Sequence, residues 1–166
     1  GSRLAALEML QSGTTLHTDM YYFEEEVAKA TKEAGMRGVL GQTVIGFPVA
    51  DAKSPAEGLA RAERFMQAFK GDPLVTATVA PHSMYTVDAA TLTATRDLAR
   101  KYSVPLLTHL AETRDEVVES LQKHQLTPAA YFASLGFWDT PALAAHGVHL
   151  SDEDIAILVK HRVALS

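Results

Sequence analysis

The sequence of 166 residues is 47% hydrophobic and 21% charged, which is typical of a folded globular protein and excludes a disordered one. Its formal net charge of -5, with no cluster of Lys and Arg, argues against nucleic acid and anionic membranes as partners and favours a small molecule. Because the chain has no cysteine, disulfides and thiolate metal sites are impossible, and we expect a protein of the reducing cytoplasm.

The chain alternates predicted helices and strands from one end to the other. No apolar run approaches the roughly 18 residues of a membrane span, no signal peptide is recognised, and Gly1-Ser2 resembles a remnant of cloning. Leu4, Leu7 and Leu10 line one stripe of the first helix. In chain order the predicted elements are a helix over 3–12, a strand over 14–20, a helix over 23–34, a strand over 36–45, a helix over 54–69, a strand over 74–80, a helix over 88–102, a strand over 104–107, a helix over 113–124, a helix over 127–136, a strand over 142–145, a helix over 151–159 and a strand over 163–166.

Polar residues mark the starts of most predicted helices. A Ser, Thr or Asp just before a helix accepts hydrogen bonds from its first free backbone N–H groups, and a following proline or acid strengthens the signal. In the helix over 113–124 we predict that Val117, Val118 and Leu121 form the inner face. The predicted capping residues are Ser54, Asp88, Thr113, Thr127 and Ser151.

Six predicted strands separated by helices indicate an α/β fold with a parallel sheet and right-handed crossovers. No linker or change of composition divides the chain, so residues 1–166 are predicted to form a single domain. A complete eight-stranded barrel takes about 250 residues, and this chain has room for about six of its eight units. The sequence therefore predicts a partial (β/α)8 TIM-type barrel that lacks the first and last barrel strands.

The stretch over 104–113 carries the first candidate site. Val104 to Leu107 is a short apolar run that suits a strand covered on both faces. His109 and Glu112 then fall in the turn between strand and helix, at the edge where α/β proteins place functional groups. A neutral imidazole there can bind a metal, and the carboxylate can relay protons to and from a water. The alternative is a structural one, in which the histidine is hydrogen-bonded in the core and the carboxylate favours the helix start.

Repetition strengthens the functional interpretation. Three successive predicted strands end in a histidine, namely His82, His109 and His146. Because the carboxyl ends of parallel strands meet at one rim, the three imidazoles can converge although they are distant in sequence. Together with Glu112 they predict a hydrolytic site, since hydrolysis by a metal-activated water needs a metal ligand, a proton shuttle and a group that orients the water or substrate. Packing or chance remains the alternative.

The motifs around these histidines resemble the amidohydrolase superfamily, most closely the branch of the 5-methylthioadenosine/S-adenosylhomocysteine deaminases and their chlorohydrolase relatives. The resemblance covers essentially the whole chain. The matching motifs are Pro81-His82-Ser83-Met84-Tyr85-Thr86, Thr108-His109-Leu110-Ala111-Glu112-Thr113, Ala144-Ala145-His146-Gly147-Val148-His149-Leu150, Gly13-Thr14-Thr15 and Asp19-Met20-Tyr21.

The resemblance implies a role for each matched residue. His109 would be a zinc ligand on the fifth barrel strand, and Glu112 would carry a proton from the water to the purine ring nitrogen and the departing ammonia. His146 would hydrogen-bond the attacking water or the substrate, and His82 would contact the ribose or tail of a purine nucleoside. His149 and His17 are expected to be structural or without a role, and two further histidines, His124 and His161, to be solvated on helices.

The chain also departs from the family pattern. The family's first strand carries a His-x-His pair of metal ligands and its eighth strand is followed by an aspartate ligand, and neither motif is present here. Zinc normally takes three or more protein ligands, so the chain alone is expected to be inactive. The loop after the strand over 36–45 has no arginine for an amino-acid carboxylate, and only Gln42 and Thr43 lie nearby, which favours a less polar substrate.

Three functional hypotheses follow from these observations. The first is a zinc-dependent hydrolytic deaminase of adenosine-type nucleosides and thioethers, of which this chain is a central fragment. The second is a related hydrolase that displaces chloride or another group from a heteroaromatic ring. The third is a non-catalytic partial barrel that covers its open edges by forming homo-oligomers.

Overall fold

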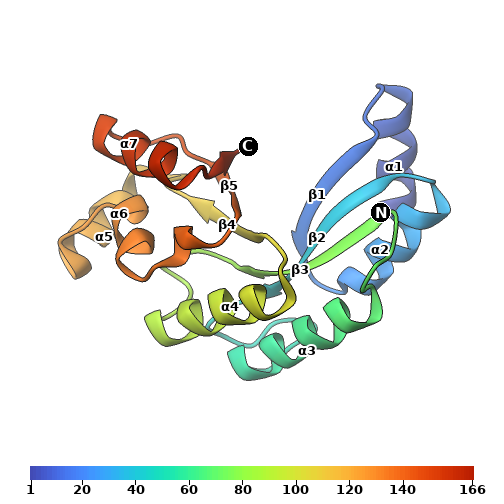
Figure 1. Ribbon diagram of the computed structural model, residues 1–166, viewed down its shortest axis with the longest axis horizontal. Coiled ribbons are helices and arrows are strands. Elements are labelled where there is room, and N and C mark those ends of the chain that lie inside the picture. The colour runs from blue at the N-terminus through green and yellow to red at the C-terminus, as the bar shows by residue number, and fades with distance from the viewer.

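A computed structural model describes all of residues 1–166 (Figure 1). The helices are α1 (Ser2–Gln11), α2 (Glu24–Glu33), α3 (Pro55–Ala68), α4 (Ala89–Tyr102), α5 (Arg114–His124), α6 (Pro128–Ser134) and α7 (Asp152–His161), with a 3-10 turn, η1 (Phe137–Asp139). The strands are β1 (Leu16–Tyr21), β2 (Arg37–Val44), β3 (Val75–Pro81), β4 (Leu106–Leu110), β5 (Ala142–His146) and β6 (Ala164–Leu165). Every predicted helix and strand is present, with boundaries shifted by a few residues.

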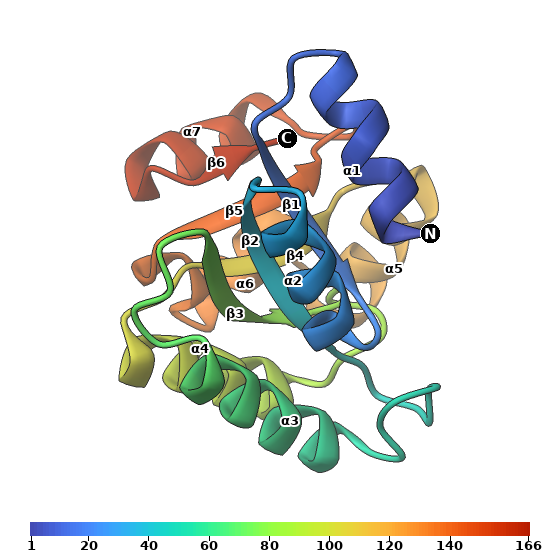
Figure 2. The ribbon, with the colours of Figure 1, turned by 90° about the vertical axis from the view of Figure 1, so that its right-hand side faces the viewer.

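The six strands form one sheet in which all neighbours are parallel and the strand order follows the sequence. The sheet curls into a half-barrel, with the helices along its convex side and β1 facing β5 across an open concave side (Figure 1). A view of the molecule turned by 90° shows that α1 lies alongside α2 (Figure 2). The predicted partial barrel of six parallel strands is therefore confirmed.

All five predicted caps form. Ser54, Asp88, Thr113, Thr127 and Ser151 each accept a hydrogen bond from a backbone N–H in the first turn of α3, α4, α5, α6 and α7, respectively. At α7 the side chain of Asp154, in the third helical position, also accepts a hydrogen bond from the backbone N–H of Ser151, which completes a capping box. These local bonds fix where each helix begins, and hence the length of each loop at the carboxyl edge of the sheet.

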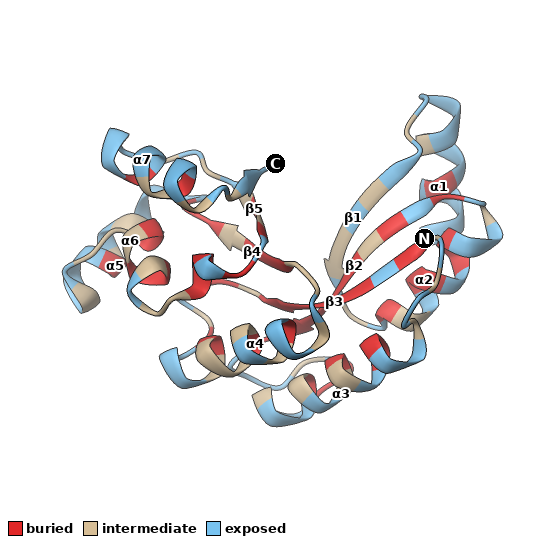
Figure 3. Cartoon of the chain, viewed as in Figure 1, coloured by how far each residue is buried: buried red, intermediate tan, exposed pale blue.

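The core lies between the middle strands and the inner faces of the helices (Figure 3). β2 and β3 are buried along almost their whole length, as expected for parallel strands covered on both faces, whereas β1 is largely exposed. Under the second half of the sheet, Phe132, Phe137 and Trp138 pack together and are almost fully buried. The Trp138 indole donates to the Ala129 carbonyl at 2.9 Å, so no polar group is left unpaired in this cluster.

The strand around residue 104 begins later than the sequence predicts. Only Leu106 to Leu110 form β4, because Pro105 has no N–H to donate to a neighbouring strand. β3 and β4 share a single register pair, Val79 with Leu106, while the other long strands share five or more. Strand β4 also ends later than the sequence predicts, at Leu110, so His109 lies within the strand and not in the turn after it. Its backbone is therefore held by the sheet.

Of the predicted inner face of α5, Val117 is partly buried and packs against the core, but Val118 and Leu121 do not face inward. Val118 is 45% exposed and Leu121 is 46% exposed, and the buried positions of the helix are Glu116 and Ser120. Both polar side chains are satisfied by backbone groups, with Ser120 donating to the Leu126 carbonyl at 2.7 Å. The helix is thus oriented by these hydrogen bonds to its flanking loops together with Val117, and not by Val118 or Leu121. No helix of the structure combines the length and the apolar character that crossing a membrane requires.

Candidate active site

The structure brings the three predicted histidines together at the carboxyl edge of the sheet. His82 follows β3, His109 lies in β4 and His146 ends β5. The ring centroids of His82 and His109 are 4.7 Å apart, and those of His109 and His146 are 5.4 Å apart in a stacked arrangement. Glu112 joins them, with its Oε1 atom 3.8 Å from His146 Nε2. The convergence predicted from the sequence is confirmed.

The orientation of His109 is fixed by the carbonyl of His82. His109 Nδ1 lies 2.8 Å from this oxygen, and the backbone N–H of His109 donates to it as well, at 3.1 Å. A carbonyl oxygen only accepts hydrogen bonds, so Nδ1 carries the proton and the neutral ring has its lone pair on Nε2. This is the tautomer that a metal ligand needs, with the second ring nitrogen held by a backbone carbonyl.

The loop that carries Glu112 is tied down by a buried carboxylate. The two oxygens of Glu116 accept from the backbone N–H groups of Ala111 and Glu112, each at 2.9 Å. Ala111 has a φ of 48° and His146 a φ of 79°, in the left-handed region that residues other than glycine rarely adopt. Strained backbone of this kind concentrates at functional sites, where surrounding bonds hold it in place. The Glu112 side chain itself is left partly exposed, free to meet a substrate.

His82 is half-buried, and its Nδ1 lies near the hydroxyl oxygens of Ser83 and Thr86, at 3.1 and 2.9 Å. Burial, reinforced by the neighbouring His109, lowers the pKa of His82 and favours the neutral ring. The ring of Tyr85 stands edge-on to the imidazole, with centroids 6.0 Å apart. His82 is therefore an uncharged group at the border of the site.

A cavity of about 280 Å³ opens beside the histidines on the concave side of the sheet. It is lined from β4 and β5 by His109 and His146, and from the opposite end of the sheet by Thr18 and Met20 of β1. The sequence motif at 19–21 pointed to β1 only by resemblance, with no role for any residue. β1 lines the cavity because the curl of the sheet brings it opposite β5 (Figure 1), an arrangement that the sequence does not reveal.

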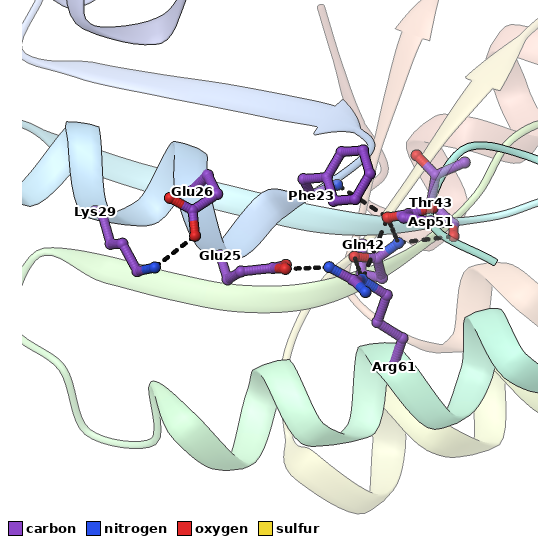
Figure 4. Close-up of polar contacts among 8 residues, drawn as sticks. All are labelled: Phe23, Glu25, Glu26, Lys29, Gln42, Thr43, Asp51 and Arg61. Atoms are coloured by element: carbon purple, nitrogen blue, oxygen red, sulfur yellow. Dashed lines mark hydrogen bonds and ion pairs between the residues drawn. The ribbon is translucent and has the colours of Figure 1, made fainter.

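A polar network that the sequence analysis missed lies next to β2 (Figure 4). The buried Asp51 accepts from the backbone N–H of Phe23 and from the Gln42 side chain, both at 2.9 Å, and lies 3.3 Å from Arg61. Arg61 also donates to Gln42 and to Glu25. No sequence pattern joins these residues, because they come from two loops, a strand and two helices.

Arg61 is consequently fully engaged within the protein. Its charge is balanced by two carboxylates, and its guanidinium also lies over the ring of Phe23, 5.4 Å from the centroid. The network connects the loop after β1, the loop after β2 and the helices α2 and α3. Two oxygens within it, Thr43 Oγ1 and Asp51 Oδ1, are buried and have no hydrogen-bond partner.

Residues 1–166 do not by themselves form a complete metal site. His109 presents a lone pair, but no group of three or more His, Asp or Glu side chains is placed to hold a metal ion. Zinc sites in proteins take three or four such ligands. The donor set of this chain fits one part of a metal site and not the whole.

The remaining histidines have structural contacts. His17 Nε2 lies 2.9 Å from the hydroxyl of Thr31, and the backbone N–H of His149 donates to the Ala111 carbonyl. His124 stacks on Tyr131 with ring centroids 3.9 Å apart, and His161 lies 3.2 Å from Asp139. The expectation that His124 and His161 are merely solvated is wrong, because each has a specific partner on a neighbouring element.

Comparison with known proteins agrees with this arrangement. The chain is 42% identical over 166 residues to a 5-methylthioadenosine/S-adenosylhomocysteine deaminase of Thermodesulfovibrio yellowstonii, which it covers to 38%. It is 37% identical over 163 residues to a 5'-deoxyadenosine deaminase of Methanothrix thermoacetophila, again covering 38% of that protein and 98% of itself. A zinc-bound adenosine deaminase of Xanthomonas campestris superposes with a TM-score of 0.95 at 33% identity, over 99% of this chain and 37% of that one.

The chain thus spans well under half the length of the relatives it matches. The sequence profile of the amidohydrolase family matches residues 1–166 throughout. With the half-barrel, the three converging imidazoles and this match, the chain belongs to the amidohydrolase family.

Proposed function

We propose that the full-length protein is a metal-dependent hydrolytic deaminase that removes the amino group of adenosine-type nucleosides and releases ammonia. The observation that carries this proposal is the cluster of His82, His109 and His146 with Glu112 at one rim of the barrel. The names of the similar proteins, two of them nucleoside deaminases and one a zinc-bound adenosine deaminase, support the reaction and the metal.

Each residue of the cluster has a proposed role that its surroundings support. Glu112, exposed at the side chain but fixed at the backbone, accepts a proton from the attacking water and delivers it to the purine ring nitrogen. It then transfers the proton of the added hydroxyl to the amino group, which leaves as ammonia. His146, 3.8 Å from this carboxylate, orients the water. His82 contacts the ribose or tail of the substrate.

His109 is the proposed metal ligand of this chain, through the bare Nε2 that its bond to the His82 carbonyl leaves. Divalent zinc makes water a stronger nucleophile near neutral pH in hydrolytic enzymes. Since one imidazole does not hold zinc, we propose that residues outside positions 1–166 complete the site. A homo-oligomeric state and a cytoplasmic location also belong to this proposal, supported by exposed apolar residues and by the absence of cysteine.

The experiment is an assay of ammonia release from 5'-methylthioadenosine by the zinc-loaded full-length protein. Glu112→Gln keeps the size of the side chain but removes the proton carrier, so kcat is expected to fall by about 10²- to 10⁴-fold. Glu119→Gln is the matched control, because Glu119 is an exposed carboxylate of α5 paired only with Lys123. Its activity is expected to equal that of the wild type. Undiminished turnover by Glu112→Gln would contradict the proposed role.

The engagement of Arg61 supports substrates with an uncharged 5' group. Its guanidinium is held by Glu25, Gln42 and Asp51, so it is not available to an amino-acid carboxylate. We expect kcat/KM for 5'-methylthioadenosine or 5'-deoxyadenosine to exceed that for S-adenosylhomocysteine by about tenfold or more, the worth of one unpaired charged hydrogen bond. Steady-state comparison of the three substrates is the measurement. An equal or higher kcat/KM for S-adenosylhomocysteine would contradict this preference. The exposed Lys53, in the loop between β2 and α3, would then be the candidate partner of the amino-acid carboxylate.

A further inference from the structure

Two hydroxyl groups hold His82 in a way that the proposed roles do not yet explain. The side-chain hydrogen bonds of His82 all involve Nδ1, which lies 2.9 Å from Thr86 Oγ1 and 3.1 Å from Ser83 Oγ. The two hydroxyl oxygens lie 2.8 Å from each other. The three atoms therefore form a closed triangle on one side of the imidazole, and Nε2 on the other side is left for a ligand.

The positions of the two hydroxyl protons decide the tautomer of His82. If Nδ1 is bare, Ser83 donates to Thr86 and Thr86 donates to Nδ1, which uses the contacts of 2.8 and 2.9 Å. If Nδ1 carries the proton and donates to Thr86 Oγ1, the Thr86 hydroxyl either donates to Ser83 Oγ, which leaves the proton of the buried Ser83 hydroxyl without an acceptor, or turns to the Ser83 carbonyl, 3.4 Å away. A bond of that length is weak. The short contacts favour the bare Nδ1 and hence a proton on Nε2.

The backbone keeps Thr86 where this arrangement needs it. Its carbonyl accepts from the N–H of Gly46 at 2.8 Å, across from the loop after β2. A Cβ atom added to Gly46 would collide with that same carbonyl oxygen, so the close approach depends on glycine. Ser83 is fully buried, and its hydroxyl has few alternatives to the triangle.

We propose that Ser83 and Thr86 are positioning residues that fix His82 as the Nε2–H tautomer, so that His82 meets the bound nucleoside as a hydrogen-bond donor. This proposal rests on the proposed function, and it deepens the role of that site. The two neighbouring rings then have opposite tautomers, because His109 presents a lone pair and His82 presents a proton. The substrate atom that His82 contacts is an acceptor, as a ribose oxygen is, and not a group that can only donate.

The first test is the nitrogen NMR spectrum of the full-length protein labelled with ¹⁵N-histidine. His82 is assigned by the signals that His82→Gln removes. We expect the wild type to show a bare Nδ1 and a protonated Nε2 at His82. The double variant Ser83→Ala/Thr86→Val removes both donors, and its His82 is expected to become a mixture of the two tautomers. Thr86→Ser, which keeps a hydroxyl, is the matched control and is expected to retain the wild-type spectrum.

Kinetics supply the second readout. If His82 contacts substrate and transition state equally, the double variant raises KM for 5'-methylthioadenosine by about tenfold with kcat little changed, while Thr86→Ser stays within about twofold. A merely structural role would alter the thermal stability without changing the tautomer or separating KM from kcat. A wild-type His82 protonated on Nδ1, or a double variant with unchanged tautomer and KM, overturns the proposal.

The spectrum also separates this proposal from the proposed function. It reads the tautomer without any turnover, so a protein that releases no ammonia loses the deaminase assignment while the role of Ser83 and Thr86 is still decided. If the double variant does not fold, the wild-type spectrum alone gives the answer, because a proton on Nδ1 contradicts the argument from the contact lengths.

Discussion

Glu24 is a carboxylic acid that the fold buries completely. It lies at the first position of α2, where its Oε1 accepts from the backbone N–H of Tyr21 at 2.7 Å and its Oε2 has no partner. Burial, and then the nearby carboxylates of Asp19, Glu25 and Asp51, raise the pKa of Glu24 from 4.5 to about 8. Near neutral pH the side chain is therefore protonated, which avoids an unpaired charge in the interior.

This burial links stability to pH with a definite sign. Between pH 4.5 and about 8 the folded protein holds a proton that the unfolded chain releases. The free energy of unfolding therefore falls as the pH rises through this window, by up to about 1.4 kcal/mol per pH unit. The stability that the extra proton on Glu24 contributes is fully present below pH 4.5 and is lost above about pH 8.

Glu24→Gln tests this linkage, because the amide oxygen can still accept from Tyr21 but does not ionise. Urea unfolding at several pH values between 5 and 8 is expected to show the wild type losing stability relative to the variant as the pH rises, by an amount on the order of a few kcal/mol. Glu26→Gln, an exposed neighbour paired with Lys29, is expected to follow the wild type. Parallel curves for wild type and Glu24→Gln would contradict the buried neutral acid.

Among the structural elements, the loops after β1 and β2 are held together chiefly by Asp51. Its side chain is fully buried, accepts from Phe23 and Gln42, and forms an ion pair with Arg61. Asp51→Asn places an NH₂ group among these donors and leaves Arg61 with one carboxylate, so we expect a loss of about 2 to 4 kcal/mol in the free energy of unfolding. Chemical denaturation measures it.

Asp97→Asn is the matched control for this prediction. Asp97 also pairs with an arginine, Arg96, at 2.7 Å, but its side chain is 57% exposed. Exposed ion pairs contribute little, so this variant is expected to stay within about 0.5 kcal/mol of the wild type. Similar losses for the two variants would show that burial of Asp51 is not what gives the pair its strength.

The same elements show which features a sequence reveals. Caps such as Ser54 and Ser151 and the strand-ending histidines were predictable, because a local pattern fixes a cap and the parallel topology brings the strand ends to one rim. The network of Asp51 and Arg61 was not, since its members meet only after α2 and α3 pack on the sheet. On α5, Val118 and Leu121 were wrongly predicted to face inward, because hydrogen bonds of Glu116 to its loop outweigh this part of the apolar pattern.

In the whole molecule the sheet consists of two well-paired parts, β1 to β3 and β4 to β6, joined by a thin β3–β4 ladder. The joint is reinforced at the rim, where the backbone N–H and Nδ1 of His109 both donate to the His82 carbonyl. The candidate site thus sits on the seam between the two parts. The bonds that orient the proposed ligand are also the bonds that close the sheet at this edge.

The ends of the sheet determine how the chain behaves in solution. β1 and β6 each pair with only one neighbour, and apolar side chains stand exposed beside them. On α1, Leu4 is 61% and Leu7 52% exposed. Contiguous exposed apolar surface and unpaired strand edges favour association. We therefore expect residues 1–166 to sediment as dimers or larger species and not as a monomer of 17.9 kDa.

Replacing the leucines of α1 tests which surface drives this association. Leu4→Gln/Leu7→Gln removes apolar area from α1 while keeping good helix formers, so the weight-average mass at a given concentration is expected to fall toward the monomer. Val118→Gln changes an exposed apolar residue on α5, which lies on the opposite side of the molecule from α1 (Figure 1), and is expected to leave the mass unchanged. A wild-type chain that sediments as a monomer throughout would show that these exposed residues do not bring copies together, and equal effects of the two variants would mean that general hydrophobicity, not α1, is responsible.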